Sequence, residues 1–477
     1  MSDKSIAIIG GGVAGSTVAL HLAEIGLNVT LIEKGDSLVS GPPICHLHAG
    51  GNLYREISTD QCIELLKQSL DTVRLFPHTL NHRPTIIAIP HQDAGDPTDL
   101  IPRLEQVKIA YSDFCEKDTH NQVLGDPSEY YQLFSREDLE SLKGKSQSGN
   151  FEEIADWLIP VANNVDLDAI KFPVIAVQEP GWSVFRQGAS AMLALEQIPN
   201  CNLILNSEVV DLHKSKDGWV VKYRHNGQLL DFQCDYLINA SGYKTGHIDD
   251  MVQQQRERLV EFKAAYVTHW QQNQEQWPEV IFHGQRGTPN GMAQLTPYCD
   301  NIFQLHGMTK DITLFEGGLV ESESDTSQPK LPSELEDNLK SGWETDVAEL
   351  RTRRAIDFIA RTVPNFSSAD CAGTPLFGAQ QIPGKDDTLR AADVSFAGEK
   401  YARLEIVKGS SALQGAMTLV EHWQLVDDLP NYQAQTIEQL HPTALSLTEC
   451  EIESKAIEVA QERGYPDSLA KCFGHRR

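Results

Sequence analysis

The chain has 477 residues, which corresponds to about three domains at roughly 150 residues each and is long enough to bury a sizeable core. Its 67 acidic and 40 basic residues give a formal net charge of −27, a charge that opposes binding to nucleic acid and to anionic lipid surfaces. With 40% apolar and 22% charged residues, the composition is that of an ordinary globular protein and excludes global disorder.

The cysteine pattern and the apolar runs indicate in which compartment the protein is found. The nine cysteines form no C-x-x-C pair, so neither a disulfide framework nor a thiolate zinc site is predicted. Metal motifs such as H-E-x-x-H do not occur either, and we expect no metal. The apolar run near the N-terminus is too short for a secretion signal, and no run of about 18 apolar residues follows. We therefore expect a cytoplasmic protein without a membrane span.

The first strand, turn and helix carry a dinucleotide-binding pattern. Residues 5–9 form an apolar run typical of a buried parallel strand, and Gly10-Gly11-Gly12-Val13-Ala14-Gly15 follows as G-x-G-x-x-G. In this pattern Gly10 permits the tight turn, Gly12 lets backbone amides approach a pyrophosphate, and Gly15 permits close packing of helix and strand. A second strand, residues 28–32, ends at Glu33, which is placed to accept hydrogen bonds from ribose hydroxyls, and Lys34 follows it.

Two middle segments extend this pattern. Residues 203–211, which include Val210, indicate a strand with a turn, and the alternation in residues 218–223 indicates a half-exposed hairpin strand. The apolar strand 235–239 then ends in Ala240-Ser241-Gly242. This ending is similar to the A-T-G signature of flavoproteins with two dinucleotide-binding folds, although any strand that ends in a glycine turn has the same form.

A late segment completes the predicted cofactor site. Residues 394–398 form a further buried strand that stops at Gly398, and Lys408-Gly409-Ser410-Ser411 opens a helix that either serine could cap. A flavin that accepts a hydride gains negative charge at its N1 and C2 carbonyl edge, and a helix N-terminus with a nearby cation stabilises such charge. Lys408 and the amides after Gly409 are the candidates, although Lys408 could equally be a solvated loop lysine.

Together these blocks resemble the D-amino acid oxidase/glycine oxidase (DAO) superfamily of FAD-dependent oxidoreductases. The resemblance implies an extended FAD and a substrate domain whose antiparallel sheet covers the isoalloxazine ring. It also implies an α/β fold class, with a two-dinucleotide-binding (Rossmann-like) FAD domain and an interleaved α+β substrate domain. The stretch Leu47-His48-Ala49-Gly50 is similar to the H-x-x-G segment that lies against the flavin in several members, where in some the histidine is covalently linked. His46 and Cys45 leave this alignment open.

The blocks divide the chain into discontinuous domains. We expect the FAD-binding domain at 1–58, 181–245 and 370–424, the substrate domain at 59–180 and 246–369, and a C-terminal helical extension at 425–477. Within the substrate domain, apolar spacing predicts an amphipathic helix from Asp60 to Phe76, and His306 lies on an apolar, strand-like segment from which it could point toward the flavin or simply belong to the sheet.

The predicted function is that of an FAD-dependent dehydrogenase or oxidase. Such an enzyme takes a hydride from the C–H bond of a carbon that bears an amine or hydroxyl on a small substrate, while His48 or His306 takes the proton. A flavin-dependent monooxygenase or halogenase-like enzyme and a partner-binding protein with structural FAD are alternatives. The electron acceptor, whether oxygen, a quinone or a carrier protein, stays open. The predicted cofactor-binding residues are Gly10, Gly12, Val13, Ala14, Gly15, Glu33, Lys34, His48, Val210, Ala240, Ser241, Gly242, Gly398, Lys408, Gly409, Ser410 and Ser411, and the predicted catalytic residues are His48 and His306.

Overall fold

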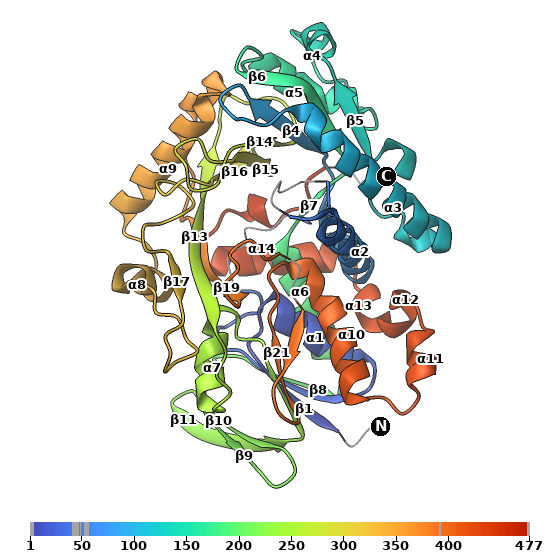
Figure 1. Cartoon of the computed structure of the whole chain (residues 1–477), viewed down its shortest axis with the longest axis vertical. Coiled ribbons are helices and arrows are strands. Elements are labelled where there is room, and N and C mark those ends of the chain that lie inside the picture. Colours follow the sequence, from blue (N-terminus) through green and yellow to red (C-terminus); the bar gives the residue numbers. More distant parts are fainter. Residues whose placement is uncertain (1–3, 41–46, 48, 52–56, 391–392, 475–477) are drawn as a thin grey trace.

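The protein is described by a computed structural model that covers residues 4–40, 47, 49–51, 57–390 and 393–474. Two large sheets organise this part of the chain (Figure 1). None of the helices in these ranges combines the length and hydropathy that crossing a bilayer requires.

The first sheet has six strands and is built around the N-terminal strand. Its order is β20 (Val394–Phe396), β21 (Tyr401–Leu404), β12 (Tyr236–Asn239), β1 (Ser5–Ile9), β2 (Asn28–Ile32) and β8 (Cys201–Ile204). All neighbours pair in parallel except β20, which pairs antiparallel with β21. The inner parallel strands β21, β12 and β1 are largely buried, as their near-continuous apolar runs predict, whereas the edge strand β8 is half-exposed.

Alternate side chains of β1 pack on different layers. Ile6 and Ile8 face the core formed with helices α1 (Val13–Glu24), α6 (Val184–Gln197) and α10 (Ala412–Trp423). Ala7 and Ile9 face the three-stranded sheet of β9 (Ser207–Lys214), β10 (Trp219–His225) and β11 (Gln228–Cys234). This three-layer arrangement confirms the Rossmann-like part of the predicted α/β fold.

The second sheet has ten strands and is largely antiparallel. Along its path lie β17 (Leu319–Glu321), β13 (Arg258–His269), β16 (Ile302–Gly307), β15 (Ala293–Pro297), β14 (Glu279–Phe282), β4 (Thr85–Pro90), β6 (Ile170–Val177) and β5 (Tyr131–Phe134). β18 (Asp370–Cys371) and β19 (Leu376–Pro383) also pair with β13, and only β14 and β4 are parallel neighbours. Strands from distant segments thus meet in one sheet, the α+β arrangement expected of the substrate domain.

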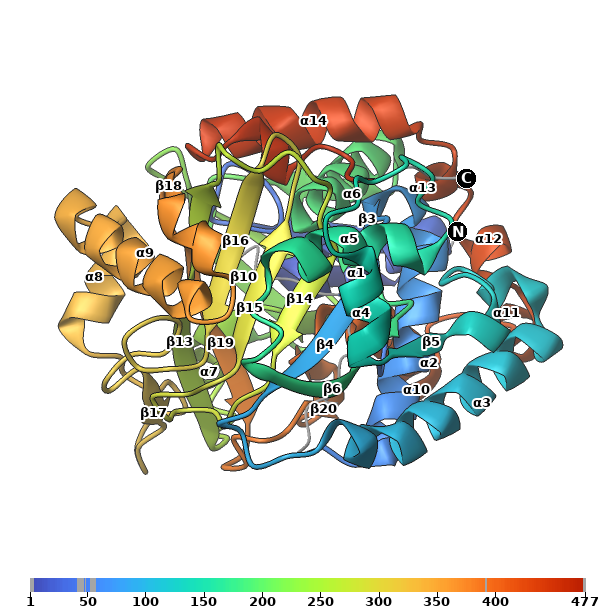
Figure 2. The same cartoon turned by 90° about the horizontal axis from the view of Figure 1, so that it is seen from above.

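Helices cover the ten-stranded sheet and join it to the first one. On one face α4 (Arg136–Leu142), α5 (Ile154–Asn164) and α9 (Thr345–Ala360) share a core with β13–β16, while α2 (Thr59–Leu75) and α3 (Ile101–Lys117) share another with β4 and β6. The amphipathic helix predicted from Asp60 to Phe76 agrees with α2 within one residue at each end. In Figure 2, α9 and α3 lie at opposite sides of the molecule.

The C-terminal segment packs against the six-stranded sheet through helices. It forms α11 (Leu429–Gln433), α12 (Ile437–Leu440), α13 (Pro442–Leu445) and α14 (Glu449–Glu462), and apolar side chains of α14 enter the same core as α1 and α6. Figure 2 shows α14 running along the top of the molecule next to α6. The segment is therefore part of the folded body.

Two features of the late chain differ from expectation. The strand predicted at 394–398 is β20, an antiparallel edge strand, and the strand that enters the parallel sheet is β21, which sequence periodicity did not single out. β18 and β19 belong to the ten-stranded sheet, although the expected domain boundary at residue 370 placed them with the FAD-binding domain. In both cases long-range strand pairing decides the placement of a segment whose local pattern is ambiguous.

Candidate active site

The glycine turn after β1 is constrained at two positions by the protein and open at a third. Gly10 has φ 101°, and a Cβ on it would lie 2.6 Å from the carbonyl oxygen of Ala240. A Cβ on Gly15 would lie 1.8 Å from the carbonyl oxygen of Gly10. A Cβ on Gly12, by contrast, would meet no atom within 4 Å. The N-terminus of α1, which Val13 and Ala14 begin, therefore faces open space that a phosphate group can enter.

Glu33 lies at the carboxyl edge of the sheet, directly after β2. Its carboxylate is only 5% exposed and accepts hydrogen bonds from two backbone amides, Gly11 N at 2.6 Å and Gly35 N at 2.7 Å. A carboxylate has about four lone-pair positions, so further donors can still be accepted. The adjoining Lys34 is exposed.

The segment after β12 lies against the glycine turn. Ser241 donates a hydrogen bond from its hydroxyl to the carbonyl oxygen of Ile9 at 3.2 Å, and Gly242 has φ 57°. Ala240 is buried beside Gly10. Val210 on β9 is half-buried, whereas its neighbour Val209 belongs to the core between the sheet and the hairpin.

The Lys408–Ser411 turn touches the N-terminus of α1. A Cβ on Gly409 would lie 2.6 Å from the Trp182 ring and 3.1 Å from Val13 Cγ1. The two turns, separated by almost 400 residues in the chain, therefore meet at one place. This adjacency allows both turns to contact the same elongated molecule.

The serines of this turn do not cap the following helix by side-chain hydrogen bonds, contrary to expectation. Ser411 instead donates to Gln68 Oε1 of α2 at 2.5 Å. The buried Ser410 hydroxyl has no hydrogen-bond partner among the described residues. A buried hydroxyl without a partner is costly in free energy, so a partner supplied by a ligand fits this position.

Gly398 lies apart from the other predicted cofactor residues. It belongs to the turn that leads from β20 into β21, and a Cβ on it would lie 4.0 Å from Lys214 Nζ. This turn is at the amino-terminal end of β21, whereas the Gly10 turn follows the carboxyl end of β1. Because β21 and not β20 is the parallel strand, Gly398 is on the edge opposite to the other candidates.

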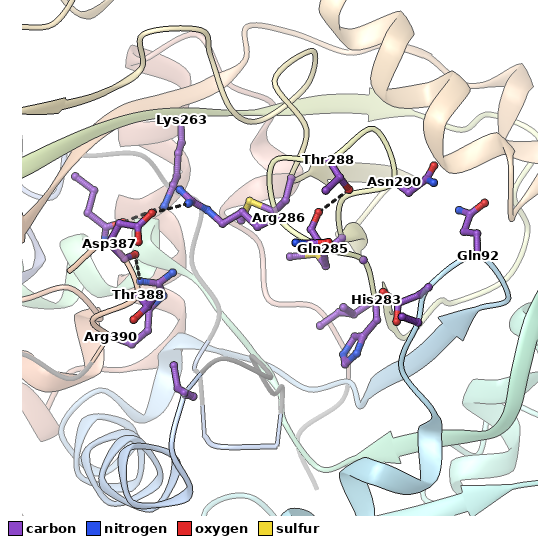
Figure 3. A pocket seen from close by; sticks show the side chains of 18 of the residues that line it. Gln92, Lys263, His283, Gln285, Arg286, Thr288, Asn290, Asp387, Thr388 and Arg390 are labelled. Carbon is purple, nitrogen blue, oxygen red and sulfur yellow. Dashed lines mark hydrogen bonds and ion pairs between the residues drawn. The ribbon is translucent and has the colours of Figure 1, made fainter. Parts of the chain in front are cut away.

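A cavity of about 740 Å³ opens beside the Lys408 turn, between it and the ten-stranded sheet (Figure 3). Its walls come from β13, from the loop that follows β14 and from the loop that follows β19. The charged or titratable side chains that line it are Asp93, Lys263, His283, Arg286, Asp387, Arg390 and Lys408.

Lys263 is a cavity residue whose acidity is strongly altered. Burial, aided by the positive charge of Arg390, lowers the pKa of its amine to about 7, while the negative charge of Asp387 acts in the opposite direction. The Glu261 carboxylate lies 2.7 Å from the amine. Glu261 and Lys263 are two positions apart on β13, so both point to the same face of the sheet. Sequence reasoning missed Lys263, and the one available signal was a pair of charged residues at alternate positions of an apolar strand.

Of the two histidines predicted as catalytic, the structure describes only His306. His48 lies outside the described residues, although its neighbours are anchored: Ala49 N donates to Glu179 Oε1 at 2.5 Å, and the Leu47 carbonyl oxygen accepts from Ser69 Oγ at 2.7 Å. His306 is buried on β16, with Nδ1 3.5 Å from Thr313 Oγ1, and does not line the cavity. Its catalytic role stays a prediction, while His283 is the histidine that lines the cavity within the described part of the chain.

Comparison with protein families identifies the chain. The family model described as DAO, FAD dependent oxidoreductase, matches residues 5–372. The chain belongs to the DAO family. It is therefore an enzyme, an FAD-dependent oxidoreductase, as the resemblance of the sequence blocks implied.

Curated relatives of this DAO-family chain are distant. Glycerol 3-phosphate oxidase of Mycoplasma pneumoniae is 23% identical over 254 residues, which are 52% of this chain and 56% of the relative. The FAD-dependent monooxygenase olcE of Penicillium canescens is 27% identical over 118 residues, which are 24% of this chain and 25% of the relative. These alignments thus span about a quarter to about half of each relative.

Solved structures share the fold of the DAO-family chain over most of its length. Glycine oxidase from Geobacillus kaustophilus has a TM-score of 0.55 at 12% identity and covers 89% of this chain and 95% of its own. L-alpha-glycerophosphate oxidase from Mycoplasma pneumoniae, solved with FAD bound, has a TM-score of 0.54 at 15% identity and covers the same shares, 89% and 95%. The Rossmann-like sheet and the cavity-bearing sheet both belong to this common fold.

The residues of the DAO-family chain fit FAD. The open space at Gly12, the buried acceptor Glu33 and the Ser410 hydroxyl, which has no partner among the described residues, are groups that a dinucleotide would use as a phosphate cradle, a ribose ligand and a hydrogen-bond donor. FAD is the cofactor of this enzyme.

Proposed function

We propose that the enzyme oxidises a small anionic substrate at a C–H bond whose carbon bears an amine or a hydroxyl. The observation that carries this proposal is the contact of the Gly409 turn with Val13, next to a cavity lined by Lys408 and Lys263. An extended FAD held by both turns would run from the α1 N-terminus to the cavity. When bound, FAD supplies the acceptor for the hydride.

Each turn holds a different part of the cofactor. The amides that follow Gly12 bind the pyrophosphate, because they are the donors at the start of α1 that no helical carbonyl can accept. Glu33 accepts from the ribose hydroxyls at the end of β2. Lys408 and the amides of Gly409–Ser411 stabilise negative charge at the ring edge.

Lys263 takes the proton of the substrate N–H or O–H group. A general base works best when its pKa is near the operating pH, and the pKa of this amine is lowered to about 7. Glu261 Oε2, 2.7 Å from Lys263 Nζ, stabilises the ammonium form that results. The products are an imine or a carbonyl compound, a protonated Lys263 and a cofactor reduced by two electrons.

The cavity favours an anion. Lys263, Arg286, Arg390 and Lys408 line it, against the two carboxylates Asp93 and Asp387. Lys263 is neutral when it acts as the base and Glu261 pairs with Arg286, so an anion would be bound by the individual cations Arg286, Arg390 and Lys408 rather than by a large net charge. The substrates named for similar proteins each carry an anionic group, the carboxylate of glycine and L-proline and the phosphate of glycerol 3-phosphate.

The test is anaerobic reduction of the purified enzyme. We expect a flavin spectrum between about 350 and 450 nm that is bleached by an anionic amine or alcohol from a panel containing glycine, L-proline and glycerol 3-phosphate with longer analogues. A protein that binds no flavin after FAD addition contradicts the proposal. Reoxidation of the bleached enzyme by oxygen, a quinone or an electron carrier then identifies the acceptor.

A monooxygenase is the second candidate, because the partial similarity to olcE points to it. Such an enzyme is reduced by NAD(P)H, whereas the proposed oxidation needs no pyridine nucleotide. Rapid mixing with NADH and NADPH in the absence of oxygen separates the two: we expect no bleaching within the turnover time.

A further inference from the structure

The cavity has two chemically different ends. In Figure 3, Lys263, Arg286, Asp387 and Arg390 gather on one side, and Gln92 and Asn290 lie on the other. The residues near this second end are mainly uncharged and polar: Gln92, Gln285, Thr288 and Asn290 all line the cavity. The titratable His283 lies among them in Figure 3, and Asp93, next to Gln92 in the chain, also lines the cavity. The charge therefore covers only part of the wall.

The two ends also differ in how their side chains are engaged. At the charged end Arg286 forms ion pairs with Glu261 and, at 3.3 Å, with Asp387. At the polar end the amide groups of Gln92, Gln285 and Asn290 have no hydrogen-bond partner within the described ranges. Thr288 Oγ1 donates to the backbone carbonyl of Gln285 at 2.8 Å and so stabilises the loop that carries two of these amides.

A second, smaller space adjoins this polar end. A smaller space of about 60 Å³ is also lined by Gln92, His283 and Asn290, and it extends toward Arg361 at the end of α9. The larger cavity, at about 740 Å³, is in the range that accommodates drug-sized ligands. The volume of the larger cavity includes the space that the ring end of FAD would fill.

We propose that Gln92, Gln285 and Asn290 form a second subsite, which binds an uncharged amide- or hydroxyl-bearing tail of the anionic substrate. The inference rests on the proposed function, since the charged end receives the reacting head. Side-chain amides both donate and accept, so they match ligand groups that do the same. An apolar tail would instead remove water from these amides without replacing the hydrogen bonds, at a cost of about 1–3 kcal/mol for each group left unpaired.

The experiment measures binding through the change in the FAD absorption spectrum on titration of the holoenzyme. The probes are acetate, which has no tail; hexanoate, with an apolar tail; gluconate, which has the same number of carbons and carries hydroxyls; and N-acetylglycine, which carries an amide. We expect gluconate, N-acetylglycine or both to bind at least about 10-fold more tightly than acetate and hexanoate. Which of the two binds more tightly decides between a hydroxyl-bearing and an amide-bearing tail.

Variants connect this preference to the subsite. In the double variant Gln92→Ala/Asn290→Ala we expect the 10-fold preference to fall to about 2-fold or less, with the acetate dissociation constant unchanged. Gln233→Ala, on an exposed position of β11, is the matched control and should keep the preference. Tightest binding by hexanoate, or an unchanged preference in the double variant, overturns the inference.

Failure of the proposed function has a different signature. A protein without bound flavin contradicts the proposed function, and the same four ligands are then compared by calorimetry, where the preference still tests the subsite. A flavin-containing enzyme in which none of the four ligands binds overturns the subsite and leaves the FAD site intact.

Discussion

The carboxyl edge of the six-stranded sheet and the wall formed by the ten-stranded sheet recognise their ligands differently. At the sheet edge the recognition groups are backbone amides and one buried carboxylate, and the constraints are steric clearances at Gly10, Gly12 and Gly15. In the cavity the groups are side chains from β13 and from two loops far apart in the chain. Local backbone geometry therefore suffices to hold a cofactor that is common to a whole family. Substrate choice instead depends on side chains that long-range strand pairing brings together.

The largest expected effect is the loss of cofactor binding at the sheet edge, with the cavity unchanged. Gly12→Val places a side chain in open space at the α1 N-terminus, so we expect the protein to fold normally but to lose FAD. The loss should exceed about 100-fold in affinity, or about 2.7 kcal/mol, measured by flavin absorbance per protein after dialysis against FAD. Gly15→Val is the contrasting variant: its Cβ collides with Gly10 O, and circular dichroism should show a loss of folded protein.

The second effect is a loss of activity caused by a change in the cavity, with the cofactor still bound. Lys263→Met should lower the rate of flavin reduction by about 100-fold or more at unchanged FAD content, because the proton acceptor is lost. In the wild type the neutral amine is the acceptor, so the rate should rise with pH through about 7, and this inflection should be absent from the variant. Lys310→Met, which removes an exposed lysine paired with Glu316, is the control and should behave as wild type. An inflection that survives in Lys263→Met assigns the base to another group.

A third prediction concerns the buried contact between α1 and the C-terminal helices. His21 Nδ1 lies 3.1 Å from His441 Nε2, and His21 Nε2 lies 2.8 Å from the Tyr432 hydroxyl. Burial lowers the pKa of His21 to about 3 and that of His441 well below its ordinary value. Both histidines are therefore neutral in the folded protein throughout the mildly acidic range.

The sign of the pH effect follows from this neutrality. Above the unfolded pKa of about 6.5 neither state binds the proton, and between about 6.5 and 3 only the unfolded state does, so stability falls with decreasing pH. For the two histidines the loss is about 2.8 kcal/mol in free energy of unfolding at one pH unit below 6.5. His21→Gln should halve this slope in urea denaturation, whereas His247→Gln, on an exposed position, should not change it. Equal slopes for wild type and His21→Gln contradict the assignment.

The smallest expected effect distinguishes a ligand contact from a structural one within the same turn. Ser410→Ala should weaken FAD binding by about 5-fold, near 1 kcal/mol, without lowering the stability of the FAD-free protein, because the Ser410 hydroxyl forms no hydrogen bond to the described part of the chain. Ser411→Ala removes the hydrogen bond to Gln68 and should lower that stability by about 1 kcal/mol. Thermal melts with and without FAD measure both quantities, and reversed outcomes contradict the roles given to the two serines.

The sequence by itself determined the nucleotide-binding edge and the fold class. Gly10 to Glu33 is a continuous strand, turn, helix and strand, so its geometry follows from local sterics and periodicity, and α2 was likewise predicted almost to the residue. The adjacency of Lys408 with this edge was inferred only through a family resemblance, since no local pattern carries it.

Only the tertiary structure decided the cavity. Lys263 has no motif, and its altered pKa exists because β13, β19 and the loop carrying Arg390 pack around it. β20 lies at the edge of the sheet because it pairs with β21, and neither strand encodes this pairing alone. The same pairing places Gly398 away from the cofactor edge. The sequence of a short apolar strand predicts that the strand is buried, but it does not predict which strand it pairs with. The pairing partner depends on packing across the whole core.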